Sequence, residues 1–404
     1  MKHIYLINNS NSPAFKYGVG TYVQQLQRCL EGHEVNLTVI NLDNQREKFE
    51  VSAEKNIRTI CIPSPHSSLA KNKYARALRY IGYFLTYYIN KNEKNIFHFN
   101  FLQQGELADL LKALYPDCKI LLTIHYLNWL MEIKGNIIKL QSILAKEKEA
   151  RTFIERAIYD EYYQDMAFLK RADQVICLSR YTESLFRRQL GITPEKMEVI
   201  YNGLEDTDFS LSEKDRHTLK SQYLLTDSEK IILFVGRVDK LKGIEYLIEA
   251  FRLVLRSVPD TRLIIVGDGD YRLCIEKSQD IWSKITFTGK IPKEKLYQFY
   301  QLAHVGVLPS LCEQCSYTAI EMMMNGLPFI GTSSTGLKEM LSDRPEDIIP
   351  LTEEADETLF PIDQLADRLI NHLSGPKKSD RGMYQDRYSF IQMKTKMNHL
   401  YANL

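Results

Sequence analysis

Two cations suited to a diphosphate follow an apolar run in the second half of the chain. The segment 236–243 reads GRVDKLKG and places Arg237 and Lys242 five residues apart, just past the run 230–235. A guanidinium can hold two oxygens at once and an ammonium acts as a point charge, so the pair suits a diphosphate better than a monoanion. From this segment alone, a solvated basic loop is the alternative interpretation.

A second segment, 308–328, places two carboxylates around a predicted helix. Ser316 is expected to cap the start of this helix, and Gly326 is expected to end it. Glu313 then lies in the loop ahead of the helix and Glu321 lies inside it. Free N–H groups at a helix start favour phosphate and carboxylates accept hydrogen bonds from hydroxyls, so the arrangement suits a nucleotide sugar. A solvated helix face is the alternative interpretation of Glu321.

Three further turns carry glycines, which let the backbone approach an anion. They contain Gly267 and Gly269 after 262–266, Gly289 and Lys290 after 285–288, and Gly18 and Gly20 ahead of the first predicted helix. Gly18 and Gly20 lack the third glycine and the later acidic residue of a dinucleotide fingerprint. A plain tight turn is therefore a nearly equal interpretation of that pair.

Apolar runs of strand length alternate with amphipathic stretches in both halves, which indicates parallel sheets joined by helical crossovers. The runs cover 4–7, 37–42, 96–101, 120–124 and 174–178 in the first half, and 230–235, 262–266, 285–288, 305–308 and 328–330 in the second. A polar segment, 202–229, is the predicted domain junction. Ligands of open α/β sheets bind beyond the carboxyl ends of the strands, so two such domains are expected to face each other across a cleft.

The composition is that of an ordinary globular protein. Of 404 residues, 44% are hydrophobic and 25% are charged, and 52 Lys and Arg against 51 Asp and Glu give a net charge of +1. This balance argues against disorder and against sequence-independent nucleic-acid binding. Seven scattered cysteines with no secretory signal ahead of them predict free thiols in the cytoplasm. Cys312 and Cys315 have no second pair to complete a zinc site, so no metal is expected.

An aromatic apolar stretch, 77–89, is shorter than the roughly 20 residues that cross a bilayer. A buried helix is the simpler interpretation. Tyr80, Tyr83, Tyr87 and Tyr88 support the alternative, in which one helix face makes a peripheral contact with a membrane.

Taken together, these motifs resemble the donor half of the retaining glycosyltransferases of family four, which have the GT-B fold. In the second half the resemblance is carried by Gly236-Arg237 with Lys242-Gly243, by 266–269, by 287–289 and by 309–328. In the first half it is carried by 18–20, by 123–125, and by 177–179 with 199–203. There are two departures: Tyr17 stands where the family commonly has a glycine, and 314–316 replaces a small residue, Phe and Gly.

The resemblance implies an α/β chain with two Rossmann-like, doubly wound domains and a last helix that crosses back to the first domain. The acceptor-side domain would cover 1–203 and the nucleotide-sugar donor domain 204–383. The last helix would cover 384–404.

The resemblance also implies roles for single residues. Arg237 and Lys242 would bind the donor diphosphate. Glu321 would hold the ribose and Glu313 the donor sugar, while His125 would lie near the reacting centre. Further residues would complete the donor site: Gly18, Gly20, Gly236, Gly267, Gly289, Lys290, Cys315, Ser316, Tyr317 and Thr318.

The expected activity is transfer of a hexose-type sugar from a nucleoside diphosphate, UDP above all, to a hydroxyl of a glycan, a lipid-linked glycan or a peptide. The resemblance implies retention of anomeric configuration without a metal or other cofactor, because the cations and the helix start stabilise the leaving diphosphate. Candidate acceptor contacts are 126–130 and 159–166. Alternatives are a sugar phosphorylase, a nucleotide-sugar epimerase, or a catalytically silent nucleotide-sugar-binding partner of another transferase.

Overall fold

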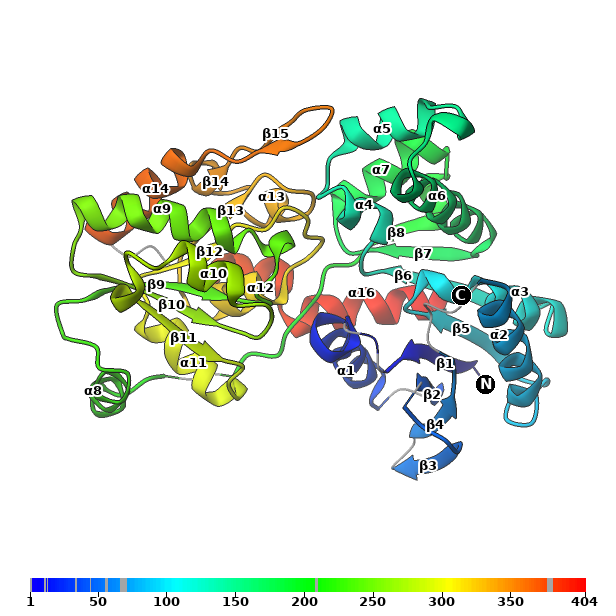
Figure 1. The fold of residues 1–404 in the computed structure, drawn as a ribbon. Coiled ribbons are helices and arrows are strands. Elements are labelled where there is room, and N and C mark those ends of the chain that lie inside the picture. Colours follow the sequence, from blue (N-terminus) through cyan, green and yellow to red (C-terminus); the bar gives the residue numbers. More distant parts are fainter. Residues whose placement is uncertain are drawn as a thin grey trace. The chain divides into compact units, whose positions relative to one another are not determined.

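The computed structural model describes residues 2–404 apart from 11, 13, 33–34, 44, 55–56, 66–70, 208–209 and 376–380. The chain forms two compact units. The first combines Met1–Trp129, Thr152–Gly203 and Ile391–Leu404, and the second combines Leu130–Arg151 with Leu204–Phe390. Each unit is built on a largely parallel sheet with helices packed against it (Figure 1). The segment 130–151, which the sequence-based division keeps with the first domain, lies in the second unit.

The sheet of the first unit has eight strands in the order β3-β4-β2-β1-β5-β6-β7-β8. They are β1 (Lys2–Asn9), β2 (Val35–Asp43), β3 (Glu50–Glu54), β4 (Ile57–Pro63), β5 (Lys94–Phe99), β6 (Lys119–Ile124), β7 (Gln174–Cys177) and β8 (Met197–Val199). β3 pairs antiparallel with β4, whereas the other neighbours are parallel. β3 escapes sequence prediction because all its residues are exposed and it has no apolar pattern.

The first unit also contains helices. They are α1 (Gly20–Leu30), α2 (Lys71–Leu85), α3 (Gly105–Leu114), α6 (Phe153–Arg171), α7 (Arg180–Leu190) and nearly all of α16 (Phe390–Asn403). Ser179 caps α7, and Thr152 forms a capping box with Glu155 at the start of α6. The last helix, α16, is bound to β1, since Lys2 Nζ donates to the Tyr401 carbonyl at 2.8 Å. A short helix, α4 (Asn128–Glu132), spans the boundary between the units.

The sheet of the second unit has six parallel strands in the order β11-β10-β9-β12-β13-β14. They are β9 (Lys230–Val235), β10 (Thr261–Val266), β11 (Ile285–Gly289), β12 (Val305–Leu308), β13 (Phe329–Thr332) and β14 (Ile348–Ile349). Its helices are α5 (Ile137–Ala145), α8 (Glu213–Gln222), α9 (Ile244–Ser257), α10 (Arg272–Lys277), α11 (Lys293–Leu302), α12 (Tyr317–Met324), α13 (Leu337–Met340), α14 (Ile362–Ser374) and α15 (Arg381–Met383). The core lies between β9, β10 and the apolar faces of α9 and α14.

Both sheets reverse their strand order at one point, as doubly wound sheets do. In the first unit β1 has β2 on one side and β5 on the other, and in the second β9 lies between β10 and β12. The ten strands predicted from apolar runs all occur, within one or two residues. The predicted junction 202–229 was expected to be a polar linking segment, but it contains a helix, α8, whose start is capped by Ser212.

The segment 130–151 is anchored to a small hairpin of the second unit, β15 (Thr352–Glu353) with β16 (Thr358–Leu359). Asn136 Nδ2 donates to the carbonyls of Glu354 at 2.7 Å and Glu357 at 3.0 Å. The Ile137 N–H donates to the Glu353 carboxylate at 2.8 Å. No apolar periodicity marks such a polar anchor, so the sequence does not assign this segment correctly.

The cysteines can be compared with the sequence expectation, and two further features of the described residues can be reported. All seven cysteines are free thiols, which confirms the expectation of unpaired cysteines. Among the described residues, no group of three or more histidines, cysteines and carboxylates is placed to hold a metal ion. Within the same residues, no helix combines the length and apolar character needed to cross a membrane.

Candidate functional site

The predicted donor residues Arg237, Lys242 and Glu313 lie where the strand order of the second unit reverses, between β9 and β12. This point of a doubly wound sheet is where ligands usually bind. The loop after β9 carries Arg237 and then a short 3-10 turn, Lys240–Lys242, whose start is capped by Asp239. The Asp239 carboxylate accepts from the Lys242 backbone N–H at 3.0 Å. The loop after β12 carries Glu313, so both charged segments reach one edge of the sheet.

Glycine lets the loops at this edge pack backbone against backbone. Gly243 has a φ of +64°, and a Cβ there would lie 2.0 Å from the Pro309 carbonyl oxygen. A Cβ on Gly267 would lie 1.7 Å from the Gly236 carbonyl oxygen. The Gly267 N–H also donates to the Gly289 carbonyl at 3.0 Å. These contacts join three predicted donor-site glycines, Gly236, Gly267 and Gly289, and so hold the ends of β9, β10 and β11 together.

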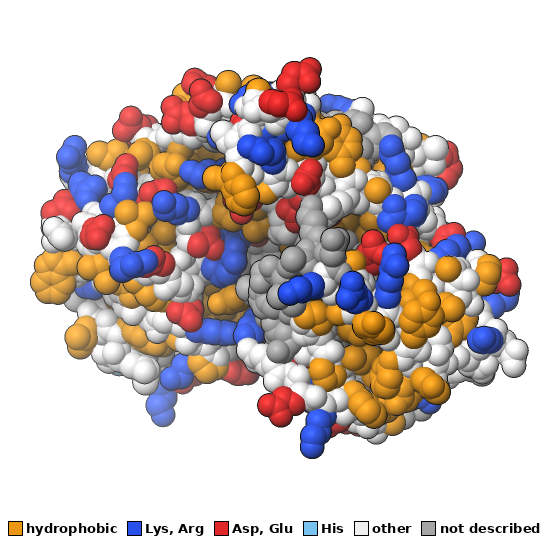
Figure 2. Space-filling model, turned by 45° about the vertical axis from the view of Figure 1, so that its right-hand side comes forward, with side chains coloured by type: hydrophobic (Ala, Val, Ile, Leu, Met, Phe, Trp, Pro, Cys, Tyr) orange, Lys and Arg blue, Asp and Glu red, His pale blue; other side chains and the backbone are white. Residues whose placement is uncertain are grey.

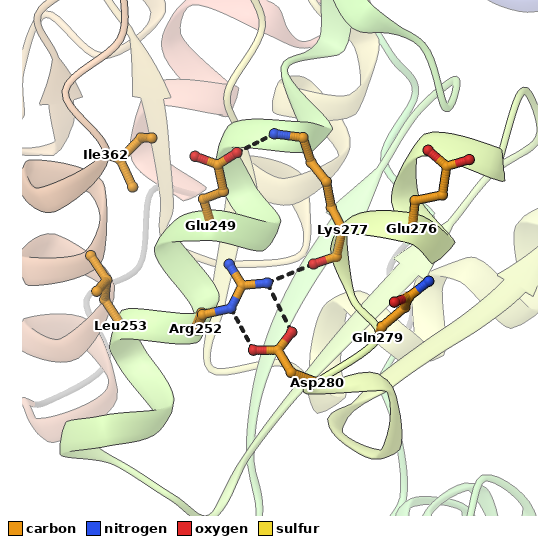
Figure 3. Close-up of a pocket in the computed structure, with 8 residues that line it drawn as sticks. All are labelled: Glu249, Arg252, Leu253, Glu276, Lys277, Gln279, Asp280 and Ile362. Carbon is orange, nitrogen blue, oxygen red and sulfur yellow. Dashed lines mark hydrogen bonds and ion pairs between the residues drawn. The ribbon is translucent and has the colours of Figure 1, made fainter.

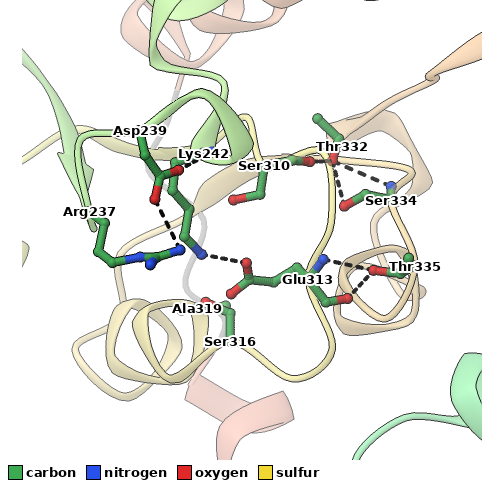
Figure 4. Close-up of polar contacts among 10 residues, drawn as sticks. All are labelled: Arg237, Asp239, Lys242, Ser310, Glu313, Ser316, Ala319, Thr332, Ser334 and Thr335. Carbon is green, nitrogen blue, oxygen red and sulfur yellow. Dashed lines mark hydrogen bonds and ion pairs between the residues drawn. The ribbon is translucent and has the colours of Figure 1, made fainter. Parts of the chain in front are cut away.

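Two ion pairs occupy the centre of the site (Figure 4). Lys242 Nζ lies 2.5 Å from Glu313 Oε2, and Arg237 Nη2 lies 3.0 Å from Asp239 Oδ2. The four side chains are 14 to 32% exposed, so a ligand can reach them. Each cation thus has a carboxylate partner within the site.

Asp239 is a site residue that the sequence interpretation missed. It stands three residues before Lys242, which is the spacing of a capping residue and the signal that could have found it. Its carboxylate serves both as cap and as the partner of Arg237.

Hydrogen bonds to Thr335 hold the loop that carries Glu313. The Glu313 N–H donates to Thr335 Oγ1 at 2.8 Å, and the same hydroxyl donates back to the Glu313 carbonyl. The Gly336 N–H donates to that carbonyl as well, at 2.7 Å. Figure 4 shows a similar bond from Thr332 Oγ1 to the Ser310 carbonyl, at 2.5 Å. These bonds fix the backbone of Glu313 and leave its carboxylate facing Lys242.

The helix after Glu313 begins and ends as the sequence predicts. Ser316 Oγ accepts from the Ala319 N–H at 3.3 Å and caps α12, and Gly326 follows the helix with a φ of +66°. Tyr317 and Thr318 form the first turn of α12. The free N–H groups of this turn lie next to the loop of Glu313, where they favour an anion.

Glu321 lies inside α12 and is buried, so the interpretation of a solvated helix face is wrong. Tyr300 donates to Glu321 Oε2 at 2.7 Å, and Lys293 Nζ lies 3.9 Å from Oε1. Burial raises the pKa of the Glu321 carboxyl, whereas Lys293 and the Tyr300 hydroxyl act to lower it. Tyr300 and Lys293 were not predicted as site residues, because nothing in their own segment links them to Glu321.

Two other predicted donor residues differ in exposure. Cys315 is buried directly ahead of α12, and Lys290 is exposed just after β11. Cys312, three residues before Cys315, is also a free thiol, and burial raises its pKa to about 12. A thiol that stays protonated in this way is a poor nucleophile.

The predicted residues of the first unit lie at the carboxyl ends of its strands. His125 follows β6, and its Nε2 lies 2.9 Å from Asn100 Oδ1. The Tyr22 ring meets the imidazole edge to face, with centroids 4.6 Å apart. Burial lowers the pKa of His125 to about 3, so the ring is neutral at physiological pH. Asn100 was not predicted; the signal for it is a polar residue inside the apolar run 96–101.

Gly18 and Gly20 adopt a different structure from the loop expected for them. Gly18 lies in a π-helical turn, Phe15–Val19, and Gly20 is the first residue of α1 with helical dihedral angles. A Cβ on Gly20 would lie 2.2 Å from the Phe15 carbonyl oxygen. The second glycine is thus required by close backbone packing within the turn.

The two stretches singled out as candidate acceptor contacts meet within the first unit. Asn128 Nδ2 donates to Glu161 Oε1 at 2.7 Å, and Trp129 Nε1 donates to Asp165 Oδ2 at 3.1 Å. Burial raises the pKa of the Asp165 carboxyl well above its ordinary value, with a further contribution from Glu161. Much of this cluster is packed in the core, and Asn128 with Glu161 forms its accessible part.

A cavity of about 550 Å³ lies elsewhere in the second unit, against α9 and α10 (Figure 3). Its charged groups are paired with one another. Arg252 binds both carboxylate oxygens of Asp280, at 2.7 and 2.9 Å, and Lys277 pairs with Glu249. None of the predicted site residues lines this cavity.

Two doubly wound units in one chain, with a charged site at the reversal point of the second, are the arrangement found in proteins of the GT-B fold. Comparison with known families agrees. The family described as Glycosyltransferase Family 4 matches residues 17–208, and the family described as Glycosyl transferases group 1 matches residues 215–381. The chain belongs to the glycosyltransferases of the family 4 type.

Individual proteins of known sequence or structure are also similar to this chain. An uncharacterized glycosyltransferase of Methanocaldococcus jannaschii is 34% identical over 199 residues, 48% of this chain and 50% of the relative. The chain thus matches about half the length of the first curated relatives found. A sucrose-phosphate synthase structure from Thermosynechococcus elongatus has a TM-score of 0.76 at 23% identity, covering 100% of this chain and 99% of the other. The Anabaena protein HepE in complex with UDP and glucose has a TM-score of 0.70 at 15% identity, with 100% of both chains covered.

Proposed function

We propose that this protein transfers a hexose-type sugar from UDP to an acceptor hydroxyl with retention of anomeric configuration. The observation that carries the proposal is the contact between Lys242 and Glu313, which joins the two loops at the reversal point of the donor unit. The likeness to HepE, whose structure contains UDP and glucose, supports the choice of donor. Family membership supports transfer to an acceptor over storage or sensing of the nucleotide sugar.

The chemistry follows from exchange of ion partners. A diphosphate that enters the site takes Lys242 from Glu313 and Arg237 from Asp239. The two cations and the N–H groups at the start of α12 then stabilise the charge that develops on the leaving phosphate. This positive charge is supplied by the protein itself, so the proposed reaction requires no metal. Glu313, released from Lys242, accepts hydrogen bonds from hydroxyls of the donor sugar.

The proposed bond changes are balanced without a covalent enzyme intermediate. The bond between the anomeric carbon and the phosphate oxygen breaks, and the acceptor oxygen bonds to the same carbon from the same face. The acceptor proton passes to the leaving phosphate oxygen. The products are a glycoside and a nucleoside diphosphate.

The test is a panel of nucleotide sugars assayed with saccharide, lipid-linked and peptide acceptors. Expected is release of UDP together with a new glycoside of the same anomeric configuration as the donor, determined by proton NMR. Inversion would contradict the proposed mechanism. Turnover that needs orthophosphate, or that changes the sugar without any acceptor, would assign a phosphorylase or an epimerase instead. Binding without turnover under every condition would assign a silent partner protein.

A lipid-linked acceptor at an anionic membrane surface is favoured by α2. The outer face of α2 and the turn after it expose Tyr80, Tyr83 and Tyr87 by 68, 56 and 86%. The segment 71–92 contains five lysines and arginines and no acidic residue. Figure 2 shows hydrophobic side chains gathered low on the right of the face that it presents. Exposed tyrosines among basic residues suit an interface with anionic lipid headgroups.

Vesicle sedimentation tests the membrane contact. Expected is binding to phosphatidylglycerol vesicles that is strongly reduced by the combined change Tyr80→Ser, Tyr83→Ser and Tyr87→Ser. Trp282→Ser is the matched control, since Trp282 is 72% exposed and lies in the other unit. Equal binding to phosphatidylcholine, or unchanged binding by the triple variant, would refute this contact. Free thiols throughout the chain fit a reducing compartment, and we place the activity at the cytoplasmic face of that membrane.

A further inference from the structure

A line of amide side chains crosses the carboxyl ends of five neighbouring strands in the first unit and ends at His125. Asn41 Nδ2 lies 4.0 Å from the Cys61 sulfur, and Asn8 Nδ2 donates to Asn41 Oδ1 at 3.2 Å. Asn100 Nδ2 donates to Asn8 Oδ1 at 2.9 Å. His125 Nε2 then lies 2.9 Å from Asn100 Oδ1. The residues come from β4, β2, β1 and the ends of β5 and β6, in the order of the sheet.

Parallel strand pairing brings these side chains into register. Asn8 of β1 is paired with Asn41 of β2, and Asn41 is paired with Cys61 of β4. Asn100 extends the line past the end of β5, where its N–H donates to the Ile7 carbonyl at 3.2 Å. The line therefore crosses the reversal point of the first sheet, between β1 and β5.

Every amide in the line donates in the same direction, away from His125. The Asn100 amide nitrogen is used by Asn8, so the atom that faces His125 is its oxygen, which can only accept. The imidazole nitrogen at 2.9 Å has to be the donor. In a neutral ring the proton is then on Nε2, and Nδ1 holds a free lone pair.

A second histidine nearby shows the contrast. His98 uses both ring nitrogens inside the unit, with Nε2 2.7 Å from Thr123 Oγ1 and Nδ1 2.5 Å from the Tyr401 hydroxyl. His98 is completely buried, whereas His125 keeps some exposure. Among the described residues of this unit, nothing is hydrogen-bonded to His125 Nδ1. Nδ1 of His125 is thus available in this unit as a hydrogen-bond acceptor.

We infer that Asn100, backed by Asn8, is a positioning residue that holds His125 as the Nε2–H tautomer and presents Nδ1 as an acceptor for a substrate hydroxyl. The titratable groups against the ring are Tyr22 from α1 and His98 from β5, and both are neutral. The assignment of a substrate to Nδ1 rests on the proposed function. The tautomer itself does not depend on any activity.

Nitrogen NMR of the full-length protein with ¹⁵N-labelled histidine tests the tautomer directly. The His125 signals are assigned as those missing from the His125→Gln spectrum. Expected are a protonated Nε2 and an unprotonated Nδ1 for His125 at neutral pH. In Asn100→Leu, the His125 signals are expected to shift toward a mixture of both tautomers. A proton on Nδ1 in the wild type, or an Asn100→Leu spectrum with the same tautomer, would overturn the inference.

Asn95→Leu is the matched control, because Asn95 is also a buried asparagine at β5 but lies at the opposite strand end and outside the line. Both variants lose a buried amide and its hydrogen bonds. Expected is a fall in kcat of about tenfold or more for Asn100→Leu with little change in the KM for the donor. Asn95→Leu is expected to keep the wild-type kcat. Equal losses of kcat in both variants would mean that Asn100 has only a structural role.

The NMR and transfer experiments distinguish a wrong tautomer assignment from a wrong proposed function. If the protein transfers no sugar, the NMR prediction still stands or falls alone. If it transfers sugar but His125 carries the proton on Nδ1, only the inference fails. Asn100→Asp adds a third readout, since a carboxylate accepts the same bond but favours imidazolium. Turnover of Asn100→Asp is expected to fall as the pH is lowered through a raised pKa of His125, and a pH profile like the wild type's would contradict this.

Discussion

The two units place opposite chemistry at equivalent positions of their sheets. At the reversal point of the second unit, Arg237 and Lys242 form ion pairs that water can reach. At the reversal point of the first, buried amides lead to a neutral His125. Ion pairs at an accessible edge can change partners when an anion arrives, whereas a directed line of amides has one stable arrangement. The comparison shows how one fold serves for charge neutralisation in one unit and for fixed hydrogen bonding in the other.

The largest effect is expected from removing the shared cation of the charged site. Lys242→Ala should lower turnover by about 10²- to 10³-fold, because a preorganised group that stabilises the leaving phosphate is lost. Nucleoside-diphosphate affinity, measured by calorimetry, should fall as well. Arg252→Ala provides the control for loss of a cation in the same unit. Unchanged affinity of Lys242→Ala would remove this residue from the site.

A smaller and more selective effect is expected for the partner of that cation. Glu313→Gln keeps the shape of the side chain but removes the charge that competes with the diphosphate for Lys242. Turnover should fall about 10²-fold, since the carboxylate no longer accepts strong hydrogen bonds from the donor sugar. UDP affinity should stay the same or rise, and steady-state kinetics with calorimetry separates the two. Wild-type turnover would contradict the proposed role of Glu313.

The buried neutral His98 predicts that the stability of the first unit falls in acid. Burial lowers the pKa of His98 to about 3 from the ordinary 6.5. Below pH 6.5 His98 binds a proton in the unfolded chain, whereas in the folded unit it binds one only near pH 3. The stability that is present above pH 6.5 is therefore lost as the pH falls toward 3. Between pH 7 and 5 this histidine should cost about 2 kcal/mol of unfolding free energy. His98→Gln should reduce the measured loss by that amount, and identical pH dependence would refute the assignment.

The smallest effect is expected at the cavity of Figure 3. Arg252→Ala removes a partly exposed pair with Asp280 and should change the free energy of unfolding by less than about 1 kcal/mol. Sugar transfer should be unaffected. A strong loss of turnover with normal stability would mean that this cavity contributes to activity.

The strands and the donor loops were predictable because their signals are local. Apolar runs mark β9 and β12, and the capping residue Ser316 and Gly326 mark the ends of α12. The order of the strands then brings Arg237, Lys242 and Glu313 to one edge without further information.

Contacts between distant segments were not predictable in this way. The anchor at Asn136, the pairing of Tyr300 with Glu321 and the bond from His125 to Asn100 each join side chains that no periodicity relates. A polar residue that is solvated in one fold and buried with a partner in another has the same local pattern. Only the packed structure distinguishes the two cases.

The first unit is completed by a helix that follows the whole second unit in the sequence. Its sheet is complete by β8, yet the buried ring of His98 finds its partner in Tyr401, and Lys2 of the first strand is bound to the same turn of α16. During synthesis the ribosome has to complete the whole second unit before it supplies this helix. The contacts of Tyr401 with His98 and Lys2 therefore form only after the second unit has been synthesised.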